Sequence, residues 1–345
     1  MTTTFTLPRD AEATAPPEWR GLARDEVRLL AVAPTGLTSS VFRELPTLLE
    51  PGDLVVVNTS PTLPARLDAR RADGTVVPLH VSTTLDDGSW VVELRRPDNS
   101  GPDLGVEPGA VLRLPGGLRL TLLTGYPDLS TATRLWRTRT DPVVPTTTYL
   151  PRHGRPITYG YVDGTFPLAD YQNVYAGEAD TGGSAEMASA GRPFTANLLV
   201  RLMTSGIAVA PLTLHTGVSS PEAHEPPAPE PYRVPEATAR LVNSTRHAGG
   251  RVVAVGTTVT RALESAAGDD GVTRAAGGWT ELVLGPERPA RAVTGLITGL
   301  HLPEASHLLL LEAVAGPELV SAAYAEAVAD RYLWHEFGDS MLFLP

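Results

Sequence analysis

Residues 251–267 read R-V-V-A-V-G-T-T-V-T-R-A-L-E-S-A-A, and this stretch decides the fold class. The run 252–255 is short, apolar and rich in valine, which is typical of a strand buried inside a sheet. Gly256 follows the run directly, and a helical pattern begins after it. A buried strand that turns into a helix at a glycine is the unit from which α/β domains are built. The sequence therefore predicts an α/β domain.

The same alternation of strands and helices extends along the chain on both sides of this stretch. Apolar runs over residues 54–57 and 207–214 predict two further buried strands. Residues 198–203, 235–247 and 318–332 have the apolar spacing of helices, and a proline opens the second of them.

Residues 66–140 differ in character from the rest of the chain. Short alternating runs such as 89–94 and 111–114 are separated by Pro-Gly and Asp-Asp-Gly turns, the pattern of a small β-barrel or sandwich. Because α/β-like sequence flanks this zone on both sides, we expect a small β domain inserted into an α/β main domain. The expected bounds are residues 66–148 for the insert and residues 1–65 with 149–345 for the main domain.

The composition excludes several classes of protein. The 345 residues include no cysteine, which excludes disulfide frameworks, thiolate nucleophiles, iron–sulfur clusters and cysteine zinc sites. All 28 cationic side chains are arginine, and 39 acidic residues bring the formal charge to −11. An acidic balance argues against a broad nucleic-acid-binding face, because neutralising phosphates needs clustered cations.

Targeting and membrane signals are weak in this sequence. The N-terminal residues 1–12 are polar and lack the basic region and apolar core of a signal peptide. The most apolar stretch, 308–315, is short and contains Glu312. We therefore expect a cytoplasmic, soluble protein without a membrane segment.

The turn after the strand 252–255 is the sharpest candidate for a ligand site. A glycine lets a ligand approach the backbone closely, and the free N–H groups that open a helix can hold an anion or a polar edge. Thr257 and Thr258 could instead simply cap the helix. Arg261 and Glu264 lie three residues apart on one helical face, so they form either a surface ion pair or part of a polar site.

Two histidines lie where ligands usually bind in α/β proteins. His215 and His301 each follow an apolar run, and the carboxyl ends of strands line the binding crevice of such sheets. The alternative for each is an ordinary boundary histidine. No histidine pair has the spacing of metal ligands on a helix, so we infer no metal. The loops 176–191 and 219–235, the second rich in proline, are either functional or solvated connections.

The motifs of this chain resemble the S-adenosylmethionine:tRNA ribosyltransferase-isomerase family of queuosine biosynthesis. The stretch 251–267 is similar to a family motif, and further similarities follow the same order along the chain. They are R-D-E-V-R-L-L at 24–30, P-G-D-L-V at 51–55, P-A-R-L at 64–67, Y-Q-N-V-Y-A at 171–176, G-W-T at 278–280, T-G-L-H-L-P-E-A-S at 298–306 and F-G-D-S-M at 337–341.

This resemblance implies a fold, a reaction and a substrate. The implied fold is an α/β domain with an inserted β-barrel. The implied reaction transfers and isomerises the ribosyl part of S-adenosylmethionine onto 7-aminomethyl-7-deazaguanine at the tRNA wobble position, giving epoxyqueuosine and releasing adenine and methionine. No metal is implied. Because a sulfonium acidifies the adjacent methylene and leaves readily, such a site needs a positioned base and an ordered polar pocket.

The resemblance also implies site residues. The candidate catalytic residues are His215, His301 and Glu230. The candidate substrate-binding residues are Arg66, Tyr171, Gln172, Tyr175, Gly256, Thr257, Thr258, Arg261, Glu264, Pro303, Glu304 and Asp339. We expect one polar site that gathers Gly256, Thr257, Thr258, Arg261, Tyr175, His215 and His301.

The chain departs from the family pattern in its candidate loops. Pro193 stands where the family has a histidine, a G-T-F element is missing after His215, and Glu230 alone remains of an M-H-S-E element. Three interpretations follow: the family reaction on tRNA, an S-adenosylmethionine enzyme with a small-molecule acceptor or none, and a non-catalytic binding protein. The acidic charge and the altered loops favour a small acceptor over tRNA, whereas the resemblance favours the family reaction.

Overall fold

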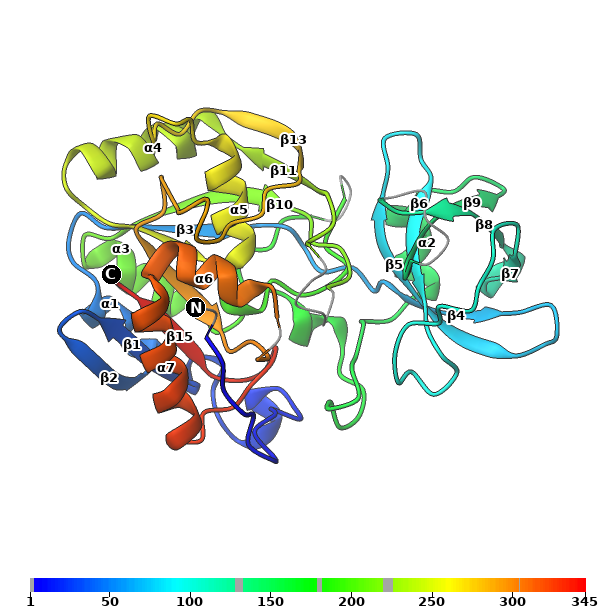
Figure 1. The fold of residues 1–345 in the computed structure, drawn as a ribbon, viewed down its shortest axis with the longest axis horizontal. Helices are drawn as coiled ribbons and strands as arrows, with labels where there is room; N and C mark the ends of the chain where they lie inside the picture. The colour runs from blue at the N-terminus through cyan, green and yellow to red at the C-terminus, as the bar shows by residue number, and fades with distance from the viewer. Residues whose placement is uncertain (1–2, 128–132, 179–181, 220–225, 304) are drawn as a thin grey trace.

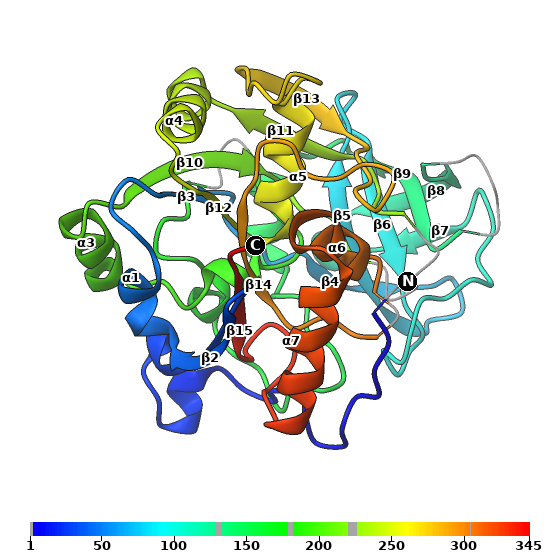
Figure 2. The same cartoon turned by 60° about the vertical axis from the view of Figure 1, so that its left-hand side comes forward.

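The computed structural model describes residues 3–127, 133–178, 182–219, 226–303 and 305–345. Figure 1 shows a larger body of sheet and helices beside a smaller body of strands, and Figure 2 shows how the helices surround the large sheet.

A nine-stranded mixed sheet forms the centre of the larger body. Its strands are, in spatial order, β13 (Ala276–Thr280), β11 (Glu230–Val234), β10 (Ala208–Leu214), β3 (Leu54–Asn58), β12 (Val252–Val255), β14 (Gly295–Gly299), β15 (Ser340–Phe343), β1 (Arg28–Ala33) and β2 (Gly36–Val41). The four strands β10, β3, β12 and β14 run parallel to their neighbours within this group. These parallel strands are buried, because helices cover both faces of the sheet.

Alternate residues of the central strands pack into two separate cores. Leu54 and Val56 of β3 belong to one core, whereas Val55 and Val57 belong to the other, as the alternation of side chains along a strand requires. The first core includes the helices α4 (Glu236–His247), α5 (Gly256–Ala266), α6 (His307–Ala315) and α7 (Pro317–Ala329). The second core includes α1 (Leu45–Leu48) and α3 (Ala196–Thr204).

The smaller body is a closed barrel of six antiparallel strands. In spatial order they are β4 (Arg66–Arg70), β5 (Val76–Thr84), β6 (Trp90–Leu94), β9 (Leu135–Asp141), β8 (Arg119–Gly125) and β7 (Val111–Arg113). The indole rings of Trp90 and Trp136 are fully buried in its core. Helix α2 (Thr146–His153) contributes Tyr149 and Leu150 to the same core, so it crosses the expected domain boundary at residue 148.

The barrel joins the larger body through two paired segments. The backbone N–H of Arg66 donates to the carbonyl of Arg155 at 2.9 Å, and the N–H of Arg155 donates back at 3.0 Å. The chain therefore enters and leaves the barrel at one neck. The predicted mixed α/β fold is confirmed, and so are the predicted strands at 54–57 and 207–214 and the helix at 235–247, which the structure places at β3, β10 and α4. The exact domain bounds stay a prediction.

Within the described ranges, no single helix is both long and apolar enough to cross a membrane. Helices α6 and α7 reach that length and composition only as a pair, and they are bent by 120° at the break between them.

Candidate active site

The carboxyl ends of four parallel strands meet at one edge of the large sheet. Asn58 ends β3, His215 follows β10, Gly256 follows β12, and the loop after β14 leads to His301. Ligands of open α/β sheets bind at this edge. Residues 59–65 lead directly from β3 into the barrel, so the barrel lies beyond the same edge (Figure 1). A ligand that binds at this edge would therefore lie between the two bodies.

A pocket of about 260 Å³ lies at this edge, and we call it the sheet-edge pocket. Helices α5 and α6, strand β11, loops of the main body and Arg134 at the barrel form its walls. The lining residues are Arg134, Thr216, Gly217, Val218, Ser219, Pro226, Pro227, Ala228, Glu230, Thr257, Thr258, Arg261, Leu282, Val283, Leu284, Ser306, His307, Leu309 and Leu310. The lining thus combines polar and charged groups with leucines, as in many small-molecule sites.

The turn between β12 and α5 has the geometry that the sequence predicts. Gly256 has φ +89°, a conformation that side-chain-bearing residues rarely adopt, and it begins α5 directly after the strand. No side chain caps the helix, so the alternative that Thr257 or Thr258 is a cap is wrong. Both threonines line the pocket instead, and Thr258 Oγ1 lies 3.5 Å from the Asn58 amide nitrogen.

Arg261 is paired with Glu230 inside the pocket. The Arg261 side chain is 7% exposed, and its guanidinium donates to the Glu230 carboxylate and to the carbonyls of Leu282 at 3.1 Å and Thr280 at 3.3 Å. Glu230 also accepts from the Gly217 N–H at 3.0 Å. Burial raises the pKa of Glu230, and the positive charge of Arg261 opposes that shift. The pocket therefore contains a buried carboxylate held by one arginine.

Glu264 lies away from this pair, although it is three residues from Arg261. Its carboxylate accepts from the backbone N–H groups of Arg291, Ala292 and Val293 at 2.8–3.0 Å, and from Arg288 at 3.2 Å. The Arg261–Glu264 ion pair, one of the two alternatives for these residues, is not formed, because Arg261 pairs with Glu230. Glu264 instead anchors the segment that leads into β14, and it does not line the pocket.

His215 lines a second pocket of about 370 Å³ between the main body and the barrel. Its Nδ1 is hydrogen-bonded to Ser60 Oγ at 2.7 Å, and Ser60 Oγ is in turn 2.7 Å from Ser184 Oγ. Burial lowers the pKa of His215, which keeps the ring neutral near pH 7. The walls of this pocket include Ser82 and Thr146, so they come from both bodies.

His301 lies behind the sheet-edge pocket and stacks on a histidine that lines it. The rings of His301 and His307 are parallel within 2°, with centroids 4.5 Å apart, and His301 Nε2 is hydrogen-bonded to Thr298 Oγ1 at 3.0 Å. Burial lowers the pKa of His307 to about 4, so the ring is neutral near pH 7. Pro303 lies in the connecting loop, and Glu304 lies outside the described residues.

Gln172 and the backbone of Tyr171 hold the segment that leads from β3 toward the barrel, whereas Tyr175 packs against the second core of the main body. Gln172 exchanges two hydrogen bonds with the backbone of Thr62, at 2.7 and 2.9 Å, and the Thr62 hydroxyl donates to the Tyr171 carbonyl at 2.7 Å. Tyr175 packs against Phe194 with ring centroids 5.7 Å apart. These three residues do not line the sheet-edge pocket.

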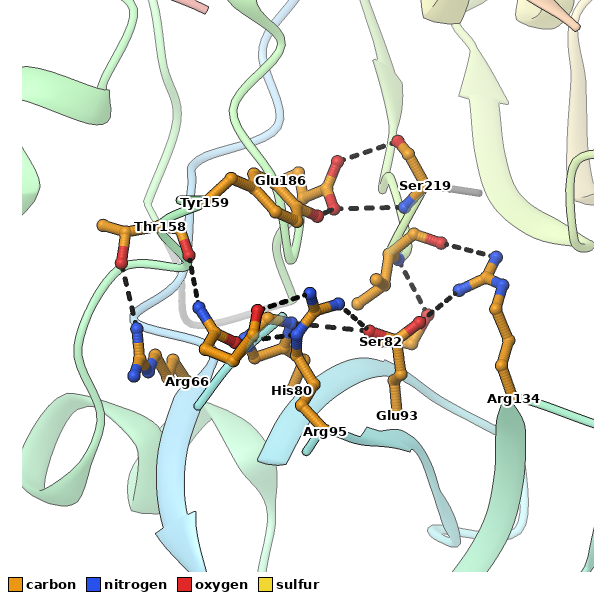
Figure 3. Close-up of polar contacts among 12 residues, drawn as sticks. Arg66, His80, Ser82, Glu93, Arg95, Arg134, Thr158, Tyr159, Glu186 and Ser219 are labelled. Atoms are coloured by element: carbon orange, nitrogen blue, oxygen red, sulfur yellow. Dashed lines mark hydrogen bonds and ion pairs between the residues drawn. The ribbon is translucent and has the colours of Figure 1, made fainter. Parts of the chain in front are cut away.

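Asp339 and Arg66 are also held in structural contacts. The Asp339 carboxylate accepts from the backbone N–H groups of Arg28 and Leu333, each at 2.8 Å, and so ties the C-terminal segment to β1. Arg66 donates from Nη1 to Thr158 Oγ1 at 3.0 Å (Figure 3). The seven residues expected in one site are thus divided: Thr257, Thr258 and Arg261 line the sheet-edge pocket, whereas Gly256, His215, His301 and Tyr175 do not.

A buried ionic network connects the barrel to the wall of the sheet-edge pocket (Figure 3). Glu93 accepts from Arg95 at 2.6 Å and from Arg134 at 2.8 Å. Arg134 also donates to the Val218 carbonyl at 3.2 Å, and the Val218 N–H donates to Ser82 Oγ at 2.9 Å. The loop that follows His215 is therefore fixed by barrel residues.

Among the ionisable residues that line the pocket, sequence reasoning missed two, His307 and Arg134. His307 opens a mostly apolar helix, and its position as the polar first residue before four leucines was the available signal. Arg134 comes directly before the barrel strand β9, and nothing in its local sequence indicates a ligand. Within the described residues, no group of three or more His, Asp or Glu side chains could hold a metal ion.

The fold and the pocket define a class of α/β protein with a small-molecule site between the main body and a barrel. A family model described as "Queuosine biosynthesis protein" matches residues 2–343. The S-adenosylmethionine:tRNA ribosyltransferase-isomerases of Symbiobacterium thermophilum and Thermus thermophilus are 35% and 37% identical. The first alignment covers 99% of this chain and 98% of the relative, and the second covers 93% of each.

A solved structure is similar over the same length. The crystal structure of S-adenosylmethionine tRNA ribosyltransferase from Thermotoga maritima is 29% identical and gives a TM-score of 0.54, with 99% of both chains covered. The chain therefore belongs to the queuosine biosynthesis protein family. The resemblance inferred from the motifs is confirmed.

Proposed function

We propose that this protein is an S-adenosylmethionine-dependent transferase-isomerase that acts on tRNA. It transfers and isomerises the ribosyl group of S-adenosylmethionine onto 7-aminomethyl-7-deazaguanine, forms epoxyqueuosine, and releases adenine and methionine. The observation that carries this proposal is the sheet-edge pocket, in which a buried Glu230–Arg261 pair faces the threonines of α5. Relatives that align over nearly the whole chain are named for this reaction. A tRNA substrate places the activity in the cytoplasm.

The residues of the sheet-edge pocket fit the chemistry of a sulfonium. Removing a proton next to the sulfonium requires a base that is ionised near pH 7 and shielded from water. Burial makes the Glu230 carboxylate more basic, and Arg261 favours its ionised form. We assign Glu230 as the proton acceptor, and Thr257, Thr258 and His307 as the residues that orient S-adenosylmethionine through neutral hydrogen-bonding groups. Of the three residues predicted to be catalytic, Glu230 is the one that lines this pocket.

The second pocket gives the acceptor nucleoside a place beside the first. His215 and Thr216 are neighbours in sequence, and they line the second pocket and the sheet-edge pocket respectively. A reaction between two substrates needs two adjoining subsites that hold the reacting atoms together. We assign the 7-deazaguanine to the pocket of His215, and His301 to positioning His307 through their ring stack.

The barrel completes this site as an inserted domain, for which we propose the predicted bounds 66–148 with the end moved to Arg155, so that α2 is included. It has its own buried core around Trp90 and Trp136. Arg66 and Arg155 pair at the neck where the chain enters and leaves. In this arrangement the barrel positions Arg134 and Ser82 against the loop 216–219 of the main domain.

The proposal is tested by incubating the protein with S-adenosylmethionine, with and without tRNA that carries 7-aminomethyl-7-deazaguanine. Adenine and methionine are measured by mass spectrometry, together with the mass of the modified nucleoside. We expect both products in equal amounts and only when tRNA is present. Release without tRNA would assign the protein to a small-molecule or acceptor-free reaction, and no release would overturn the proposed activity.

A further inference from the structure

Three exposed arginines stand side by side across neighbouring strands of the barrel. Arg70 of β4 is paired directly with Arg113 of β7, and Arg113 is paired directly with Arg119 of β8. Residues directly opposite each other in antiparallel strands point to the same face. The inward neighbours of these arginines, such as Leu112 and Leu120, are buried, so the arginines lie on the outer surface. We call these three residues the arginine row.

The arginine row is electrostatically unfavourable in the protein alone. Like charges directly opposite each other on a sheet repel, and this repulsion destabilises the fold. Arg119 has a carboxylate partner, Asp141, which continues the same row on β9. Arg70 donates to the carbonyl of Gly74 at 2.8 Å. Among the described residues, the Arg113 guanidinium has neither an ion pair nor a hydrogen bond, so the centre of the row is open to an anion.

The net charge of the whole chain does not show that the barrel carries a local excess of positive charge. Residues 66–155, the barrel with α2, hold 12 arginines against 10 acidic residues, a net charge of +2. The rest of the chain holds 16 arginines against 29 acidic residues, a net charge of −13. The expectation that an acidic chain lacks a nucleic-acid-binding face therefore applies to the main body and not to the barrel.

From this placement, we propose that the arginine row binds the phosphate backbone of the tRNA. The inference rests on the proposed function, because that function supplies the RNA. Guanidinium groups bind phosphates with paired hydrogen bonds, and backbone contacts fix the position of a nucleic acid without reading its sequence. Strand β7 lies at the end of the molecule farthest from the large sheet (Figure 1). The tRNA thus extends along the barrel while its modified base reaches the edge of the sheet.

The test uses the full chain and compares Arg70→Gln, Arg113→Gln, Arg119→Gln and the triple variant with the wild type. Binding of the tRNA is measured by fluorescence anisotropy over a range of salt concentrations. Each substitution weakens binding about fivefold near physiological salt, and it lowers the slope of log affinity against log salt by about 1. Arg113→Lys keeps the charge and retains most of the slope. The KM for S-adenosylmethionine stays unchanged in all of these variants.

The matched control is Arg240→Gln, which removes an exposed arginine of α4 and changes the net charge by the same amount. We expect its affinity and salt slope to equal those of the wild type. If the triple variant also keeps the wild-type affinity and slope, the arginine row does not bind tRNA and the inference is overturned. Binding of the row to phosphatidylglycerol vesicles but not to tRNA would also overturn it.

Failure of the inference and failure of the proposed function give different results. A wild type that releases adenine with tRNA, together with variants that bind tRNA equally well, refutes the arginine row alone. A wild type that binds tRNA through the row but never consumes S-adenosylmethionine refutes the proposed reaction and supports the row. Circular dichroism confirms that each variant is folded, and relief of charge repulsion predicts no loss of thermal stability for Arg113→Gln.

Discussion

Replacing Arg261 with methionine tests whether the Glu230–Arg261 pair is the buried ionic centre of the pocket. Methionine fills a similar volume but cannot donate a hydrogen bond. The Glu230 carboxylate then keeps the Gly217 N–H at 3.0 Å as its remaining partner. The carbonyls of Leu282 and Thr280 also lose their donor. We therefore expect both a loss of stability and a change in how stability depends on pH.

The size of the loss follows from the pKa of Glu230. Burial already raises that pKa, and removing the positive charge of Arg261 raises it further, so the folded variant favours the protonated form of Glu230. At pH 7 the unfolded chain has Glu230 ionised, and binding its proton on folding costs about 3 kcal/mol. The two unsatisfied carbonyls add about 1–2 kcal/mol. The total, about 4–5 kcal/mol, is in the range for breaking a buried ion pair.

The sign of the pH dependence separates this explanation from a packing defect. The folded pKa lies above the unfolded value of 4.5, so the stability of the variant falls as pH rises through that interval. Lowering the pH from 7 to 5 should therefore restore part of the lost free energy of unfolding. A loss caused by packing alone would not recover at low pH.

The assay is urea unfolding followed by circular dichroism at pH 5 and pH 7. Arg261→Met combined with Glu230→Gln lacks the titrating carboxylate, so its stability should be less dependent on pH than that of Arg261→Met. Arg240→Met is the matched control, because Arg240 and Glu236 form an exposed pair in which both side chains are more than 60% exposed; it should cost less than about 0.5 kcal/mol. An Arg261→Met loss below about 1 kcal/mol at pH 7, or an equal loss at both pH values, would refute the reasoning.

Three further predictions concern single residues around the site. Gly256→Ala places a side chain at φ +89° and should lower the free energy of unfolding by about 1–2 kcal/mol, measured in urea, whereas an unchanged value would contradict the need for glycine. Burial raises the pKa of Glu336, which lies beside Tyr161, to about 7. The free energy of unfolding of the wild type should therefore fall by about 3 kcal/mol between pH 4.5 and 7. Glu336→Gln should remove this fall, and parallel curves of stability against pH for the two proteins would contradict the prediction. His307→Leu should raise the KM for S-adenosylmethionine up to about tenfold while His307→Asn stays within about threefold, and equal KM values would show that His307 does not contact the substrate.

Local sequence patterns predicted the central strands because each is a short apolar run bounded by a turn. The β12–Gly256–α5 unit has its glycine at a positive φ, as its strand-to-helix position requires. The order of the strands in the sheet could not be predicted from local patterns. Strand β15 near the C-terminus pairs with β1 near the N-terminus, and no local pattern encodes a pairing of such distant segments.

The candidate site was predicted in part for the same physical reason. Thr257 and Thr258 follow a strand, so their place at the carboxyl edge of the sheet was expected. Glu230 and Arg261 are 31 residues apart in sequence, and they meet because β11 and α5 pack against each other. Glu264 lies three residues beyond Arg261, but its carboxylate accepts hydrogen bonds from the backbone of the segment before β14. The groups that a polar side chain contacts thus depend on tertiary packing.

The most direct test of the account is a crystal structure of the protein soaked with S-adenosylmethionine. We predict the adenosyl group in the sheet-edge pocket, within hydrogen-bonding distance of Thr257, Thr258 or His307, and the sulfonium beside the Glu230 carboxylate. Density for S-adenosylmethionine in the pocket of His215, or elsewhere on the molecule, would contradict the assignment of the active site.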